Sequence, residues 1–171
     1  MHPQMVTLFD FSSPTSEEDW RTTDDVVMGG ISSSTLTVEP PEIGVFQGTV
    51  SLDRGGGFAS VHAPLPSTNL SEYHGLEMRI RGDGNRYRLR LRTGASALTY
   101  QSPFGTQPGS WQSTRLPFQS FRPTFHGQVI ADAPSLDTTE VTSLGWIIAD
   151  RQAGQFRLEV DWVRAYVEET T

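Results

Sequence analysis

The feature that most constrains this chain is a pair of strictly alternating segments in its middle, residues 76–81 and 86–92. In each segment every second residue is apolar, and nearly all the residues between are arginines. A period of two is typical of a strand that buries one face in a core and exposes the other. We therefore predict two strands that point the following residues into the core: Leu76, Met78, Ile80, Tyr87, Leu89 and Leu91.

The four residues between these segments, Gly82 to Asn85, favour a short turn. Gly, Asp and Asn all tolerate the positive φ angles of tight connections. We predict that the two strands form a hairpin and that Asp83 belongs to its turn. Such a hairpin would gather one arginine face from six residues: Arg79, Arg81, Arg86, Arg88, Arg90 and Arg92.

The rest of the chain repeats the pattern of short strands. Runs of β-branched and aromatic residues are punctuated by Gly, Pro, Asn and Asp, and no long segment has helical periodicity. About ten strands in 171 residues predict a single all-β domain, residues 1–171, built as a two-sheet sandwich, with a long loop over 118–139. The expected strands are 6–11, 32–38, 45–52, 58–63, 76–81, 87–93, 98–103, 112–117, 144–150 and 156–167.

The arginine face is the first candidate binding surface. Like charges on neighbouring strands repel, so carboxylates must offset them. Glu77, Glu159 and Asp161 can do this within the chain, or an acidic partner can do it from outside. We expect no nucleic-acid partner, because the net charge of −7 opposes nonspecific binding and because Tyr87 points away from the arginines instead of offering a ring beside them.

The second candidate surface is the segment 24–32, which follows Trp20 and lies between two predicted strands. An acidic pair, a methionine and two glycines in a loop can present backbone groups and an apolar tip to a partner. The alternative is a tight loop that satisfies its own hydrogen bonds and is anchored by Trp20. The candidate contact residues are Asp24, Asp25, Met28, Gly29, Gly30 and Ser32.

No group of residues suggests catalysis. The chain has no cysteine, and its four histidines lack metal-ligand spacing. A nucleophile elbow, a phosphate loop and a dinucleotide fingerprint are all missing from the sequence. The adjacent carboxylates Asp24 and Asp25 would diverge in a strand instead of facing each other across a cleft. We therefore expect a binding protein with no catalytic residue, no cofactor and no metal.

The chain also contains no apolar run near the ~18 residues that span a bilayer, and it begins without a signal-like or presequence-like segment. We expect a cytoplasmic protein that inserts no segment into the membrane and reaches it only through its partner.

Several segments, taken in order along the chain, resemble the complex I intermediate-associated protein 30 family. The most specific are Asp25-Val-Val-Met-Gly-Gly30, Gly56-Gly-Phe-Ala-Ser60 and Arg81-Gly-Asp-Gly84. The resemblance also includes Leu8–Phe11, Trp20, Phe46–Gly48, Trp111, Leu116–Phe118 and Gly154–Glu159.

The resemblance implies a galactose-binding-like jelly roll, related in fold to carbohydrate-binding modules, in a protein that assists the assembly of respiratory complex I, an NADH dehydrogenase. Relatives in photosynthetic organisms join this domain to a dehydrogenase-like domain and serve photosystem II biogenesis. The implied function is a non-catalytic assembly factor or chaperone that contacts a protein subunit of an electron-transfer complex.

A second hypothesis is a carbohydrate-binding module, in which Trp20 and Trp111 would stack on sugar rings. A third, weaker one is a hydrolase or lyase built on the same sandwich. Modules with this fold often hold a structural calcium ion through oxygen ligands. Asp10 and Asp161 are the candidates for such a site.

Overall fold

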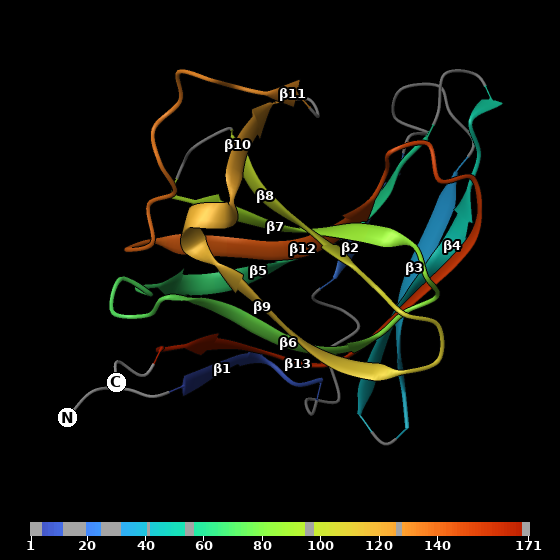
Figure 1. The fold of residues 1–171 in the computed structure, drawn as a ribbon, viewed down its shortest axis with the longest axis horizontal. Helices are drawn as coiled ribbons and strands as arrows, with labels where there is room; N and C mark the ends of the chain where they lie inside the picture. The colour runs from blue at the N-terminus through green and yellow to red at the C-terminus, as the bar shows by residue number, and fades with distance from the viewer. Residues whose placement is uncertain are drawn as a thin grey trace.

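The computed structural model describes residues 5–11, 20–24, 32–40, 42–53, 57–94, 98–125 and 128–168. The described strands form two antiparallel sheets, of six and seven strands, that pack face to face (Figure 1). The architecture is a jelly-roll β-sandwich, and the all-β prediction is confirmed. No helix in the described ranges is long and apolar enough to cross a membrane.

The six-stranded sheet has the order β3-β4-β13-β6-β9, and β1 pairs with β13 beside this path. Strand β13 is the longest and pairs with β1, β4 and β6, so the first and last described strands lie side by side (Figure 1). The bounds are β1 Met5–Phe9, β3 Ser33–Glu39, β4 Ile43–Val50, β6 Gly75–Arg81, β9 Trp111–Pro117 and β13 Gly154–Tyr166.

The seven-stranded sheet has the order β11-β10-β8-β7-β12-β5-β2. A short 3₁₀ turn, Phe118–Ser120, links β9 of the first sheet to β10 of the second. The bounds are β2 Arg21–Asp24, β5 Ala59–Thr68, β7 Arg86–Thr93, β8 Thr99–Gly105, β10 Arg122–Phe125, β11 Gln128–Val129 and β12 Val141–Ile148.

The core fills the space between the two sheets. Its largest fully buried side chain is Trp146 of β12, whose indole Nε1 donates to Met78 Sδ across the sandwich at 3.4 Å. The six residues predicted to point into the core from the alternating segments are all buried, which confirms the alternation. Burial of this apolar surface is the main force that holds the sheets together.

The predicted hairpin is wrong. Strand β6 pairs with β9 and β13, whereas β7 pairs with β8 and β12, so the two strands belong to opposite sheets. Residues Gly82 to Asn85 carry the chain from one sheet to the other. Both strands still turn their apolar residues into the core, because the core lies between the sheets. The arginines of β6 and β7 therefore point to opposite sides of the molecule.

All ten predicted strands are present, with shifted ends. The prediction missed β2, β10 and β11, which have four, four and two residues. Segment 118–139 was expected to be a long loop, and that expectation is wrong in part because it contains the 3₁₀ turn, β10 and β11.

Candidate functional site

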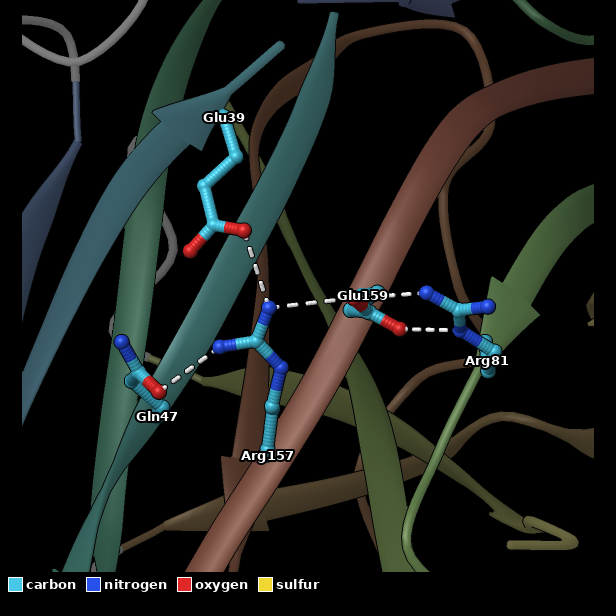
Figure 2. Close-up of polar contacts among 5 residues, drawn as sticks. All are labelled: Glu39, Gln47, Arg81, Arg157 and Glu159. Atoms are coloured by element: carbon cyan, nitrogen blue, oxygen red, sulfur yellow. Dashed lines mark hydrogen bonds and ion pairs between the residues drawn. The ribbon is translucent and has the colours of Figure 1, made fainter. Parts of the chain in front are cut away.

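Arg79 and Arg81 lie on the outer face of the six-stranded sheet, where carboxylates of β13 pair with them. Arg79 Nε donates to Asp161 Oδ2 at 3.1 Å. Arg81 donates through Nε and Nη2 to the two carboxylate oxygens of Glu159, and the Nη2 distance is 3.0 Å (Figure 2). The register places Arg81 directly opposite Glu159. For Arg79 and Arg81 the charge is therefore offset within the chain, by Asp161 and Glu159.

Glu159 is also the centre of a wider network (Figure 2). Arg157 Nη2 lies 3.0 Å from Glu159 Oε1 and 3.0 Å from Glu39 Oε1, while its Nη1 lies 2.9 Å from Gln47 Oε1. Hydrogen bonds from Arg81 and Arg157 lower the pKa of Glu159, although partial burial acts in the opposite direction. Two cations, Arg81 and Arg157, and two carboxylates, Glu39 and Glu159, thus balance one another in this network.

Trp111 of β9 lies beneath the same arginines. The guanidinium carbons of Arg79 and Arg81 are 4.8 Å and 4.9 Å from the centre of its ring. Four residues further along β9, Arg115 lies directly opposite Glu77 and donates through its Nε to Glu77 Oε2 at 2.8 Å. The charged side chains of β6 therefore form ion pairs and cation–π contacts with residues of the neighbouring strands β9 and β13.

Asp83 holds the connection between the sheets together. Its carboxylate oxygens accept hydrogen bonds from the Tyr87 hydroxyl at 3.0 Å, from the backbone N–H of Asn85 at 3.0 Å and from the backbone N–H of Arg157 at 2.7 Å. Burial, followed by the charge of Asp83, raises the pKa of Tyr87. Asp83 was predicted to contact a partner, but its carboxylate is engaged inside the fold.

The candidate loop is described only at its two ends. Asp25, Met28, Gly29 and Gly30 lie outside the described residues. Asp24 is the last residue of β2 and pairs with Ala59 of β5. The other end of the loop is Ser32. This residue is 1% exposed, and its Oγ accepts a hydrogen bond from the backbone N–H of Ser51 at 2.9 Å, so Ser32 lies inside the fold.

Arg86, Arg88 and Arg90 lie on the outer face of the seven-stranded sheet. Arg88 pairs with Asp150 and donates to Gln101 Oε1 at 3.2 Å. Arg86 is exposed, and its backbone N–H and C=O are bonded by the side chain of Gln152 at 2.8 Å each. The charge of Arg88 is therefore paired within the chain, and that of Arg86 is exposed to solvent.

Arg90 differs from its neighbours because it is largely buried without a counter-ion. Its Nε has no hydrogen-bond partner, and none of the ion pairs among the described residues includes it. Burial, followed by the nearby charge of Arg92, lowers the pKa of Arg90 to about 10. The group stays protonated at neutral pH, so the fold holds an uncompensated cation, an arrangement that costs stability.

Arg90 forms part of the wall of a cavity of about 120 Å³. In the middle of this wall, Gly145 of β12 lies directly opposite both Arg90 and His62, so no side chain fills the space between them. A Cβ at position 145 would come within 2.1 Å of the Val61 carbonyl oxygen, which explains the glycine. The lining residues are His62, Arg90, Leu91, Arg92, Thr99, Ser143 and Gly145.

The electrostatics of the cavity are cationic. Burial, followed by the charges of Arg90, Arg92 and Arg21, lowers the pKa of His62 from its ordinary value of 6.5. The imidazole is therefore mostly neutral at pH 7. Sequence reasoning missed His62 and Gly145 as site residues. They are far from Arg90 in the chain, and only the pairing of β5, β12 and β7 places the three residues side by side.

The residues that the carbohydrate-binding and calcium-site hypotheses require make other contacts within the fold. Trp20 is 6% exposed and stacks on Trp146 with ring centres 5.1 Å apart, so it is a core residue. Asp161 pairs with Arg79, and the described part of the chain contains no group of three His, Asp or Glu residues suited to a metal. Of the two candidates for a calcium site, Asp161 is therefore already neutralised by a cation of its own chain.

Comparison with known sequences points in one direction. A sequence model of the family described as complex I intermediate-associated protein 30 matches residues 9–160. An uncharacterized protein of Schizosaccharomyces pombe is 30% identical, over 94% of this chain and 84% of that protein. The mitochondrial complex I intermediate-associated protein 30 of Drosophila melanogaster is 28% identical over 91% of this chain, but the match spans only 61% of the fly protein.

The solved structures give the same fold with little sequence identity. The family 11 carbohydrate-binding module of a cellulosomal cellulase of Clostridium thermocellum has a TM-score of 0.73 and 18% identity, and the match covers 98% of each chain. At that identity the likeness establishes the fold alone. The sequence match covers nearly the whole sandwich described above, and the chain belongs to the complex I intermediate-associated protein 30 family.

Proposed function

We propose that this protein is a non-catalytic assembly factor for an electron-transfer membrane complex, respiratory complex I or a photosynthetic counterpart, and that it acts by binding a protein subunit. The observation that supports this most strongly is the family match over residues 9–160. The relatives named for complex I extend beyond the region matched here, since the chain spans about three fifths of the fly protein. The identity of the complex that this protein helps to assemble is therefore part of the proposal.

The outer face of the seven-stranded sheet is the better candidate for the contact surface. On the six-stranded sheet, Arg79, Arg81 and Arg157 are paired with carboxylates of their own chain. On β7, by contrast, Arg86 and Arg92 are exposed, and no ion pair among the described residues includes either of them. Exposed guanidinium groups on a protein of net charge −7 would steer an acidic partner to this face. The loop 24–32 stays the second candidate.

The test is capture of partners from native cells after gentle solubilisation of the membranes. We expect the tagged protein to recover subunits of one electron-transfer complex and expect Arg86→Gln/Arg92→Gln to recover several-fold less. The matched control is Arg79→Gln/Arg115→Gln, which removes the same charge from the opposite face. Recovery of no such subunit contradicts the assembly role. Equal recovery by both variants would place the contact elsewhere.

The carbohydrate-binding alternative is supported by the fold and by little else. Trp20 lies in the core, and Trp111 already contacts two guanidinium groups of its own chain. We therefore expect a glycan array to show no binding that depends on Trp111. Affinity for a glycan that Trp111→Ala abolishes would revive this alternative.

A further inference from the structure

We propose that the cavity between β5, β12 and β7 binds one small oxyanion, a carboxylate or a phosphate group, through Arg90, Arg92 and His62. Arg92 also belongs to the proposed contact surface, but the anion site is argued from the cavity alone and does not depend on the assembly role.

The first support is the charge of the wall. Two guanidinium groups and an imidazole line one cavity, and Arg21 lies close enough to influence His62 as well. No carboxylate lines the cavity or forms an ion pair with Arg90 or Arg92 within the described ranges. Elsewhere on the sandwich the structure pairs Arg79, Arg81, Arg88, Arg115 and Arg157 with carboxylates. Arg86 of the same strand has no ion pair among the described residues either, but it is exposed to solvent, whereas Arg90 is largely buried.

The second support is an uncompensated charge. Arg90 is largely buried, none of the ion pairs among the described residues includes it, and its Nε–H, which is closed to solvent, lacks an acceptor. A buried charge without a counter-ion costs stability. An oxyanion in the cavity would neutralise the guanidinium, whose planar fork matches carboxylate and phosphate oxygens. The same anion would favour the protonated form of His62 and so raise its lowered pKa.

The third support is size. At about 120 Å³ the cavity is well below the roughly 300–1,000 Å³ of pockets that hold drug-sized ligands. It has room for a single small anion. The space exists because position 145 has no side chain between His62 and Arg90, and the glycine there is required by the close approach of the Val61 carbonyl oxygen.

The experiment uses the purified chain with two probes, inorganic phosphate and succinate, at pH 7 and constant ionic strength maintained with sodium chloride. We expect at least one probe to shift the NMR signals of the His62 imidazole and the Arg90 Nε–H in a saturable way. The same probe should raise the melting temperature by about 3–6 °C at roughly tenfold its Kd. Response to phosphate alone identifies a phosphate site, response to succinate alone a carboxylate site, and either supports the proposal.

Two variants make the test specific. Arg90→Gln should lose the response, whereas Arg86→Gln, which removes the same charge from the same strand outside the cavity, should keep it. Should Arg90→Gln not fold, the signals of His62 and Arg90 in the natural protein still decide the question. The proposal is overturned if neither probe moves them or if Arg90→Gln responds like the natural chain. Because the assay contains no partner, its failure leaves the assembly role untouched.

Discussion

Arg90 and Glu159 show how two partly buried charges are treated differently in one fold. Glu159 receives hydrogen bonds from Arg81 and Arg157, and its pKa is lowered as a result. Arg90 has no such partner, and burial lowers its pKa instead. The first charge stabilises a surface, whereas the second costs stability until a ligand compensates it.

His62 should give stability a dependence on pH. Its pKa is lowered in the folded protein by burial and by Arg90, Arg92 and Arg21, while β12 presents only the uncharged Ser143 and Gly145 to it. As pH falls through about 6.5 the unfolded chain takes up the proton first, so this contribution lowers the free energy of unfolding. Urea denaturation should show a smaller loss between pH 7 and pH 5 for His62→Gln than for the natural protein. Equal losses would contradict this account.

Asp83, a candidate contact residue in the sequence, should be important for stability. Its removal leaves the Tyr87 hydroxyl and the backbone N–H of Arg157 without their acceptor. We expect Asp83→Ala to lower the free energy of unfolding by about 1–3 kcal/mol in urea titrations. Tyr87→Phe removes only one of these bonds and should cost less. A change below about 0.5 kcal/mol for Asp83→Ala would show that the hydrogen bonds accepted by Asp83 contribute little to stability.

At the scale of elements, the main finding is that β6 and β7 lie in different sheets. The structure pairs Arg79 with Ser113 of β9, whereas the predicted hairpin would have placed it opposite Arg88. Directly opposed antiparallel residues have Cα separations suited to a disulfide. Because the chain has no cysteine, mild oxidation of double variants is a clean test. We expect Arg79→Cys/Ser113→Cys to crosslink and Arg79→Cys/Arg88→Cys to stay reduced within the monomer. The reverse result would restore the hairpin.

The strands and their buried faces could be predicted from sequence, but their neighbours could not. Alternation determines which side of Leu89 or Met78 faces the core, and this is equally true of a hairpin and of strands in opposed sheets. The residues of Gly82–Asn85 suit both a hairpin turn and a crossover between sheets. The predicted arginine face therefore combines residues that lie on two separate surfaces. Strand β10 was missed because it is short and contains Pro123, a residue that argues against a strand.

The candidate site was only partly predictable for the same reason. Arg90 was included in the prediction because of its alternating segment, but its missing counter-ion becomes visible only when burial is known. His62 and Gly145 join it through the pairing of β5, β12 and β7, which no local pattern encodes. The pairing of Glu159 and Asp161 with arginines was one of two possibilities that the sequence left open, and the position of β13 beside β6 decides it for Arg79 and Arg81.

At the scale of the whole molecule, we propose that residues 1–171 fold as one domain around one core. The core cluster includes residues of both sheets, such as Met78 and Trp146, which contact each other across the sandwich. Unfolding followed by tryptophan fluorescence and by far-ultraviolet circular dichroism should therefore give coincident urea transitions. Two separate transitions would show that the sheets or the ends unfold independently.

The net charge of −7 and the basic outer face of the seven-stranded sheet together determine which surfaces the whole molecule attracts. An acidic protein avoids nonspecific binding to nucleic acid and anionic lipid, while a local cluster of arginines still selects acidic surfaces. This arrangement agrees with the proposed role, in which the protein binds one partner during assembly.

The most direct test of the assembly role is deletion of the gene in the source organism, followed by native gel electrophoresis of its membranes with in-gel NADH dehydrogenase staining and, where the organism is photosynthetic, detection of the photosystems. We expect the deletion to deplete one mature electron-transfer complex and to accumulate its partly assembled intermediates. Expression of the natural chain should restore the complex, and Arg86→Gln/Arg92→Gln should restore it poorly. Normal amounts of every such complex in the deletion strain would contradict the proposed function.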